Sequence, residues 1–404
     1  MIYKKNKLTI DGFNINSLGV KYKTPLYCYS SEKIKKNILN LKNNFKKFNP
    51  LICYAVKANS NLGILREIKN HNIGADVVSL GELMKALKAG ISPKKIVFSG
   101  VGKTAIEIEY AIKKNILLIN AESKSEILEI EKIAKRKKKV VDVGLRLNPN
   151  TDAKTLSQIS TGKKENKFGV NQKLFFQLVS FLQKSKYLNL KCLSVHIGSQ
   201  ILSNKPYQKM LKVIDKTIKS SNHKFEYIDL GGGMGIDYYH NNSNLDLKRY
   251  SKDIEKFLKN NNCKIIFEPG RSIVGNSGIL VTKILYIKEG YKKDFVIIDA
   301  AMNDLMRPAL YGAIHKILPL RKSKVISKKS YEFVGPICES TDSFATIREF
   351  QKLNEKDLLI ICDVGAYGTS LSSNYNVRPK PSEILIKGSK IQIISKRQKI
   401  SELM

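Results

Sequence analysis

The sequence predicts a TIM-like (β/α)8 barrel followed by a second domain built as a β-sandwich or β-barrel. From residue 51 onward, short apolar runs rich in β-branched residues alternate with longer segments of helical period, which is typical of parallel βα units. Eight such runs precede residue 276, and eight parallel strands close a barrel. After about residue 276, strands separated by turns replace the alternation. We therefore expect a barrel domain over residues 25–275 and a β domain made of residues 1–24 and 276–404.

The eight predicted barrel strands are residues 51–57, 75–78, 95–100, 116–120, 142–148, 192–198, 226–232 and 264–270. The segments between them are predicted to be amphipathic helices. One such helix is expected to begin after the N-cap candidates Asn59 and Ser60, and the next to end at Gly90. The polar stretch 149–170 is too long for a simple connection, so we expect a loop over the barrel mouth there.

Composition excludes several classes of protein. No apolar run approaches the roughly 18–20 residues that a membrane span needs, and the first residues lack the apolar stretch of a signal peptide. We therefore expect a cytoplasmic protein that does not bind membranes. The six cysteines are scattered, without a C-x-x-C pair or histidines at metal-ligand spacing, so free thiols and no metal site are expected.

The net charge of +36 raises the possibility of a nucleic-acid partner. The lysines, however, are spread along the whole chain, and the densest run, residues 135–139, falls at a predicted helix end, where cations suit the helix dipole. No motif interleaves aromatic and basic residues in the manner of RNA-binding domains. We expect no nucleic-acid partner.

Polar residues cluster at the ends of the predicted strands, where the catalytic groups of barrel enzymes lie. These residues are Lys57, Asp76, Ser99, Asn120, Glu122, Arg146, His196, the glycines 231–233, Glu268 and Arg271. A lysine after an apolar strand is usually an exposed strand-end residue. At a barrel mouth, desolvation and neighbouring cations can instead suit a lysine to Schiff-base chemistry.

The glycines 231–233 follow the seventh strand, where backbone N–H groups can approach a phosphate, although such a triplet also forms ordinary turns. Glu268 could keep a pyridine nitrogen protonated or could form a local salt bridge with Arg271. His196 could stack on a flat cofactor or could be a hydrogen-bonded core residue. No Ser/His/Asp arrangement favours a hydrolase.

These motifs together resemble the PLP-dependent decarboxylases with the alanine-racemase-like barrel (fold type III), and among them the diaminopimelate decarboxylase family. The resemblance rests on residues 24–30, 54–61, 74–83, 98–104, 160–169, 195–201, 230–236, 268–278, 302–315, 334–344 and 363–368.

The resemblance implies a role for each matching residue. Catalysis is implied for Lys57, which carries the Schiff base to the cofactor, and for Cys338, His196 and Glu268. Binding of pyridoxal 5'-phosphate is implied for Lys57, Asp76, His196, Ser199, Gly231, Gly232, Gly233, Glu268, Pro269, Gly270, Arg271 and Tyr367. Substrate binding is implied for Arg271, Arg307, Tyr311, Glu339 and Tyr367.

The resemblance also implies the reaction, which is decarboxylation of meso-2,6-diaminopimelate to L-lysine, the last step of lysine biosynthesis. In ornithine decarboxylases an aspartate follows the catalytic cysteine, whereas here Cys338 is followed by Glu339. Arginines such as Arg307 suit a dicarboxylic substrate because they pair with carboxylates in a bidentate manner. The family forms homodimers with shared active sites, so Cys338 is implied to act as a proton donor from the neighbouring subunit.

Other functions remain open on the same barrel. They are a decarboxylase of ornithine, arginine or carboxynorspermidine, an amino-acid racemase, and a PLP carrier, although a carrier lacks the long second domain. The chain also departs from the family pattern at residues 156–158, in the predicted mouth loop, and at Leu80, where glycine is common. The second departure predicts that the backbone at position 80 needs no glycine-only conformation.

Overall fold

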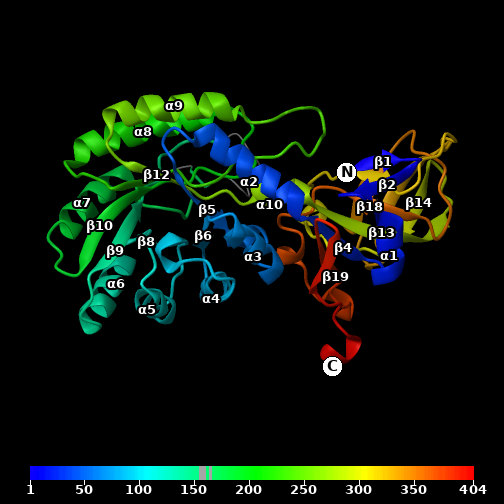
Figure 1. Cartoon of the computed structure of the whole chain (residues 1–404), viewed down its shortest axis with the longest axis horizontal. Coiled ribbons are helices and arrows are strands. Elements are labelled where there is room, and N and C mark those ends of the chain that lie inside the picture. Colours follow the sequence, from blue (N-terminus) through cyan, green and yellow to red (C-terminus); the bar gives the residue numbers. More distant parts are fainter. Residues whose placement is uncertain (154–160, 163–165) are drawn as a thin grey trace. The chain divides into compact units, whose positions relative to one another are not determined.

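The computed structural model describes residues 1–153, 161–162 and 166–404. The described chain forms two compact units, whose elements are labelled in Figure 1. The barrel unit contains residues 37–236 and 243–272, and the sheet unit contains residues 1–36, 237–242 and 273–404. Much of the predicted mouth loop, including the departure at residues 156–158, lies outside the described residues.

The barrel unit is built around a closed barrel of eight parallel strands, which confirms the predicted (β/α)8 fold. The strands are β5 (Leu51–Ala55), β6 (Gly74–Val77), β7 (Ile96–Phe98), β8 (Leu118–Ala121), β9 (Val141–Arg146), β10 (Leu188–Ser194), β11 (Tyr227–Asp229) and β12 (Lys264–Phe267). The last strand closes the barrel by pairing with the first, with Ile266 opposite Leu51. Apolar residues of five strands pack against one another in a buried cluster, namely Cys53, Val97, Leu118, Cys192 and Ile266.

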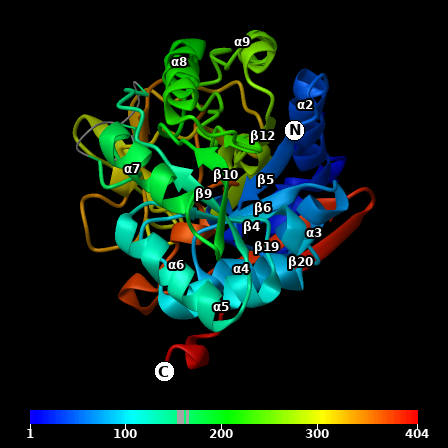
Figure 2. The same ribbon diagram turned by 90° about the vertical axis from the view of Figure 1, so that its left-hand side faces the viewer.

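Helices surround these strands (Figure 2). They are α2 (Ser31–Phe45), whose first residues belong to the sheet unit, α3 (Leu62–Asn70), α4 (Leu80–Lys88), α5 (Ala105–Lys114), α6 (Lys124–Arg136), α7 (Gln172–Leu182), α8 (Asn204–Ser221) and α9 (Leu247–Asn260). The short helix α10 (Arg271–Val274) includes the last residues of the barrel unit and the first of the following segment of the sheet unit. The described residues of this unit also form two short 3-10 helices, η1 (Val56–Ala58) and η2 (Pro93–Lys95).

Local signals explain where the helices begin and end. Helix α3 begins after Asn61, whose side chain accepts a hydrogen bond from the Gly63 N–H at 2.8 Å, so the predicted N-cap at residues 59–60 was too early. Asn59 is buried and accepts instead from the Asn61 N–H at 3.0 Å. Gly90 follows α4 with a φ of +87°, which confirms its predicted place after the helix. Leu80 is the first residue of α4, and therefore its helical backbone needs no glycine.

The sheet unit contains a three-stranded antiparallel sheet and a nine-stranded sheet. The first consists of β1 (Ile2–Lys4), β2 (Lys7–Ile10) and β3 (Phe13–Asn14). The second consists of β4 (Leu26–Ser30), β13 (Gly278–Lys288), β14 (Lys293–Ile298), β15 (Ile317–Pro319), β16 (Ser330–Val334), β17 (Ser343–Ile347), β18 (Leu358–Ile361), β19 (Ser382–Lys387) and β20 (Lys390–Ser395). The helices are α1 (Ile15–Tyr22), α11 (Arg307–Tyr311), η4 (Gly275–Ser277), η5 (Thr369–Leu371), η6 (Tyr375–Val377) and η7 (Ile400–Glu402).

Strand β4 lies inside the nine-stranded sheet, antiparallel to β13 and parallel to β19. All five of its residues are buried, which a central strand with both faces covered requires. The division between the units therefore falls after residue 36, later along the chain than the expected start of the barrel domain at residue 25.

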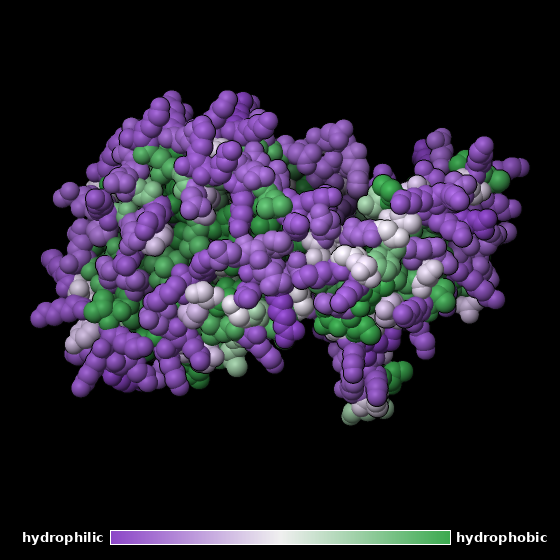
Figure 3. Space-filling view, viewed as in Figure 1, coloured by the Kyte–Doolittle hydropathy of each residue, from purple (hydrophilic) through white to green (hydrophobic). Residues whose placement is uncertain are grey.

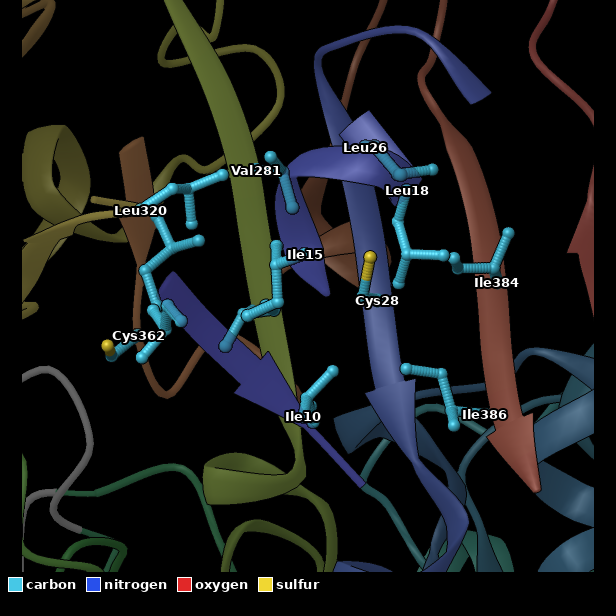
Figure 4. Close-up of a cluster of buried hydrophobic side chains, with 13 residues drawn as sticks. Ile10, Ile15, Leu18, Leu26, Cys28, Val281, Leu320, Cys362, Ile384 and Ile386 are labelled. Carbon is cyan, nitrogen blue, oxygen red and sulfur yellow. The ribbon is translucent and has the colours of Figure 1, made fainter. Parts of the chain in front are cut away.

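The core of the sheet unit joins the first residues of the chain to the last. Ile10 and Ile15 pack with Leu26 of β4, Val281 of β13 and Ile384 of β19, as Figure 4 shows. Because these residues come from both ends of the sequence, this core forms only when the two ends meet.

Hydrophilic side chains cover most of the visible surface of each unit in Figure 3. Among the described residues, no helix combines the length and the apolar character that crossing a bilayer requires.

Candidate active site

Lys57 lies directly after β5, in the short helix η1. Its Nζ is 3.0 Å from Oδ2 of Asp76, which is at the end of the neighbouring strand β6. The strand register explains this contact, since Ala55 of β5 lies opposite Asp76. The structure thus brings together two of the residues that the sequence singled out.

Asp76 is a fully buried carboxylate. Its Oδ2 accepts from Lys57, but its Oδ1 has no hydrogen-bond partner among the described residues. Buried polar atoms are nearly always hydrogen-bonded, and an exception calls for an explanation such as a donor on a bound ligand. The Lys57 side chain remains 38% exposed.

His196, which follows β10, lies against the glycine loop after β11. Its Nδ1 accepts a hydrogen bond from the Gly232 N–H at 3.1 Å, so Nδ1 carries no hydrogen. Burial, followed by the positive charges of Arg146 and Lys57, holds the pKa of His196 well below its usual value. His196 is therefore a neutral ring whose hydrogen is on Nε2.

The three glycines 231–233 allow an unusually close approach of backbone segments. Gly231 and Gly233 have φ values of +64° and +83°, in the left-handed region that favours glycine. A Cβ on Gly232 would lie 2.1 Å from the Glu268 carbonyl oxygen, and one on Gly233 would lie 2.4 Å from the Gly198 carbonyl oxygen. The packing of the strand ends therefore requires glycine here.

Residues 269–271, which come shortly after β12, contact both Ser199 and the segment that carries Lys57. Arg271 is buried, and its Nη2 donates to Oγ of Ser199 at 3.0 Å. The Pro269 carbonyl accepts from the Ala55 N–H at 3.1 Å. A Cβ on Gly270 would lie 2.9 Å from that of Ala58, so glycine lets this loop pack against the segment that carries Lys57.

Glu268 is buried and accepts a hydrogen bond from the Ser99 hydroxyl at 3.2 Å. Burial is the main cause that raises its pKa well above the usual value, and the nearby carboxylates Asp229 and Asp76 add to it, while Lys57 opposes it. Arg271, the alternative partner considered for Glu268, contacts Ser199 instead. Glu268 is thus a carboxyl group that favours a proton unless a cation is placed beside it.

Asp229 belongs to this buried cluster, although the sequence reasoning missed it. Its Oδ1 accepts from the Gly231 N–H at 2.9 Å, and its Oδ2 accepts from Nδ2 of Asn120 at 3.0 Å and from the Ser194 hydroxyl at 3.2 Å. Burial raises its pKa. The available signal was its position, since Asp229 lies in the predicted strand 226–232, two residues before the first glycine of the motif.

Glu122 and Arg146, also predicted at strand ends, form a buried ion pair of 2.9 Å. Glu122 further accepts from the N–H groups of Gly100 and Gly169, at 3.2 and 2.9 Å. These contacts hold three loops at the barrel mouth together, so both residues support the site.

In the sheet unit, Arg307 and Tyr311 lie at the two ends of helix α11. The Arg307 guanidinium is buried, and Nη1 is 2.8 Å from Nε2 of His315. Tyr367 follows β18 in a turn, half-buried, with a φ of +57°.

Cys338 and Glu339 lie between β16 and β17 and are exposed in the single chain. Asn376 Nδ2 is 3.4 Å from the Cys338 sulfur, and the Tyr375 hydroxyl donates to the Glu339 carboxylate. The segment that contains η6 therefore positions both side chains.

Comparison with known proteins identifies the family. The family model described as the pyridoxal-binding domain of pyridoxal-dependent decarboxylases matches residues 31–275. A diaminopimelate decarboxylase of Helicobacter pylori is 45% identical over 395 residues, which cover 97% of each chain. That of Aquifex aeolicus is 38% identical and covers 98% of this chain and 94% of its own.

Solved structures of diaminopimelate decarboxylases are also similar to this chain. The H. pylori enzyme complexed with L-lysine has a TM-score of 0.91 at 45% identity, covering 96% of this chain and 98% of its own. The M. jannaschii enzyme in complex with L-lysine has a TM-score of 0.94 at 36% identity, and the match covers 99% of this chain and 95% of its own.

The cofactor of this family is pyridoxal 5'-phosphate, and the residues of the barrel mouth fit it. The partly exposed Lys57 suits the aldehyde of the cofactor, and Oδ1 of Asp76, which has no hydrogen-bond partner among the described residues, suits a polar substituent of its ring. Glu268, whose pKa is raised, suits the basic ring nitrogen. On its sequence and its structure, the chain belongs to the pyridoxal-dependent decarboxylases and, within them, to the diaminopimelate decarboxylases.

Proposed function

We propose that this chain removes one carboxyl group of meso-2,6-diaminopimelate as carbon dioxide and yields L-lysine, with pyridoxal phosphate held on Lys57. The observation that carries the proposal is the Lys57–Asp76 pair at the barrel mouth, 3.0 Å apart, beside the glycine loop and the buried Glu268. The names of the relatives supply the substrate, and the two solved structures with L-lysine contain the expected product.

When bound, pyridoxal phosphate withdraws electrons from the carbon that loses its carboxyl group. Lys57 supplies the amine that binds the cofactor, and Asp76 holds this amine in place through Oδ2. His196 is neutral and presents a flat ring to the cofactor. Glu268, hydrogen-bonded to Ser99, is the residue that would hold the proton of the cofactor ring nitrogen.

The phosphate group of the cofactor is assigned to Ser199, the glycine loop and residues 268–271. The N–H groups of Gly231 and Gly232 already donate to Asp229 and His196. These two glycines therefore shape the loop, and Gly233 is the glycine we assign to the phosphate. Arg271 adds a positive charge that Ser199 holds in place.

Substrate binding is assigned to Arg271, Arg307, Tyr311, Glu339 and Tyr367. Arg307 is suited to the carboxylate that the reaction leaves intact, because a guanidinium binds a carboxylate with two parallel hydrogen bonds. Tyr311, Tyr367 and Glu339 contribute hydrogen-bonding groups, with Glu339 suited to an amine. Cys338 is assigned as the donor of the proton that replaces carbon dioxide, within a homodimer in which Cys338 of the partner subunit completes each site.

The test is the release of carbon dioxide from the purified, cofactor-loaded protein, compared across meso-diaminopimelate, ornithine and arginine. We expect rapid release from meso-diaminopimelate alone, with stoichiometric L-lysine. Faster release from ornithine or arginine would contradict the substrate assignment. Racemised amino acid without gas release would instead identify a racemase.

The role of Lys57 has a separate test. Lys57→Ala is expected to lose both carbon dioxide release and the lysine-bound cofactor, detected as a mass increase after borohydride reduction. Lys132→Ala is the control, since the side chain of Lys132 is 73% exposed and lies away from the strand ends. A Lys57→Ala protein that kept the mass increase would show that another lysine carries the cofactor.

A further inference from the structure

His315 is a buried histidine of the sheet unit that the assignments above do not use. It lies between α11 and β15, and only 2% of its surface is exposed. Its Nδ1 is 2.8 Å from the Cys362 carbonyl oxygen, and its Nε2 is 2.8 Å from Nη1 of Arg307.

The two hydrogen bonds determine the state of the ring. A carbonyl oxygen only accepts, so Nδ1 must carry a hydrogen that it donates to Cys362. A guanidinium only donates, so Nε2 must accept from Arg307 and carry no hydrogen. His315 is therefore neutral, with its single ring hydrogen on Nδ1.

A second contact fixes the Arg307 guanidinium. Its Cζ lies 4.5 Å from the centre of the Tyr238 ring, within the range of a cation–π contact. Tyr238 also meets the His315 ring edge to face, with 5.3 Å between ring centres and 78° between planes. Tyr238, Arg307 and His315 thus form one packed group, in which the imidazole and the phenol ring hold the guanidinium from two sides.

The chemistry of the imidazole suits this place. A carboxylate in the position of His315 would neutralise Arg307 and compete with an anionic substrate group. A neutral imidazole accepts a hydrogen bond and leaves the positive charge in place. Cys362 directly follows β18, and Arg307 begins α11, so the two hydrogen bonds of His315 also connect helix α11 to strand β18, which precedes the bend with Tyr367.

We propose that His315 is a positioning residue, which holds the Arg307 guanidinium in the orientation that binds the retained carboxylate of the substrate. The proposal rests on the proposed function, since it assumes that Arg307 binds this carboxylate. It predicts that losing the Nε2 acceptor weakens binding of carboxylate-bearing ligands and leaves the chemical step largely intact.

The test compares two substitutions of similar size and polarity. His315→Gln places a carbonyl oxygen near the position of Nε2 and can still accept from Arg307. The shorter side chain of His315→Asn reaches only the position of Nδ1, so it cannot accept a hydrogen bond from Arg307. We expect His315→Asn to raise KM for meso-diaminopimelate by about tenfold or more, with kcat changed less than about threefold, and His315→Gln to stay near the parent protein.

A ligand pair separates positioning from general damage to the fold. L-Lysine carries a carboxylate, and 1,5-diaminopentane is the same molecule without it. His315→Asn should weaken inhibition by L-lysine and leave inhibition by 1,5-diaminopentane unchanged, whereas a loosened fold would weaken both. His223→Leu in the barrel unit is the control, because His223 is hydrogen-bonded to a carbonyl oxygen, that of Leu190, at 2.9 Å.

Two outcomes would overturn the proposal. One is an unchanged KM and L-lysine inhibition constant in His315→Asn, and the other is an equal loss for both inhibitors. Arg307→Leu shows whether the role of Arg307 or only the role of His315 is wrong. If Arg307→Leu leaves KM unchanged, the assignment of Arg307 itself is wrong. If Arg307→Leu raises KM and His315→Asn does not, only the role of His315 is wrong.

Discussion

Lys57 Nζ lies 3.0 Å from Asp76 Oδ2, and the other oxygen of the same buried carboxylate has no partner among the described residues. A lysine that could have been an ordinary strand-end residue is thereby placed beside a carboxylate with spare capacity for a hydrogen bond.

Asp76→Asn should lower kcat/KM for meso-diaminopimelate by about 100-fold, because small displacements of a reacting group have costs of that size. Steady-state carbon dioxide release measures the effect. The control is Asp142→Asn, which removes a partner of Lys191 at 3.0 Å on a half-exposed surface. Equal activity of the two variants would mean that Asp76 does not position Lys57.

Glu268→Gln should change the pH dependence of stability in the cofactor-free protein. The pKa of Glu268 is raised in the folded state, so the folded state binds more protons than the unfolded state above about pH 4.3, the ordinary pKa of glutamate. Stability therefore falls as pH rises through this window. Glutamine cannot ionise, so the free energy of unfolding of the variant should increase relative to that of the parent as the pH rises above about 4.3.

Urea unfolding of the two proteins at several pH values measures this gain. Glu255→Gln serves as the control, since hydrogen bonding to Lys47 lowers the pKa of this half-exposed carboxylate, so that no increase in stability with pH relative to the parent is expected. Parallel pH profiles for Glu268→Gln and the parent would show that Glu268 ionises normally.

Gly232→Ala should weaken the binding of pyridoxal phosphate by about tenfold or more, equivalent to ~1.4 kcal/mol. The new Cβ would lie 2.1 Å from the Glu268 carbonyl oxygen, so the glycine loop or the Glu268 segment must move. Fluorescence titration of the cofactor-free protein gives the dissociation constant. Gly102→Ala is the matched control, because its Cβ would meet nothing within 4 Å.

Lys103→Met should destabilise the barrel unit by about 3–5 kcal/mol, because it leaves a buried carboxylate without its partner. The Lys103 side chain is 1% exposed and donates to Glu126 at 2.6 Å and to the carbonyl oxygens of Gly100 and Asn120 at 2.6 and 2.7 Å. Chemical denaturation measures the loss. Lys132→Met, at an exposed site, should have almost no effect.

Much of the barrel unit was predictable because its rules are local and periodic. Each strand is a short apolar run, each helix has a 3.6-residue pattern, and eight repeats of this pair close a barrel. The ends of parallel strands meet at one face, so the order of the residues along the chain was enough to group Lys57, Asp76, His196 and Glu268. The N-cap of α3 was missed because Asn59 and Asn61 suit a cap equally well, and burial of Asn59 decides between them.

The sequence by itself determined the fold class, the family resemblance and the residues at the strand ends, because these depend on local pattern. Tertiary structure decided what depends on distance between remote segments. It showed that β4 belongs to the nine-stranded sheet, that Asp229 shares the buried carboxylate cluster with Glu268, and that His315 contacts Arg307. Burial and hydrogen bonding set the protonation of such groups, and neither is encoded in the spacing of residues along the chain.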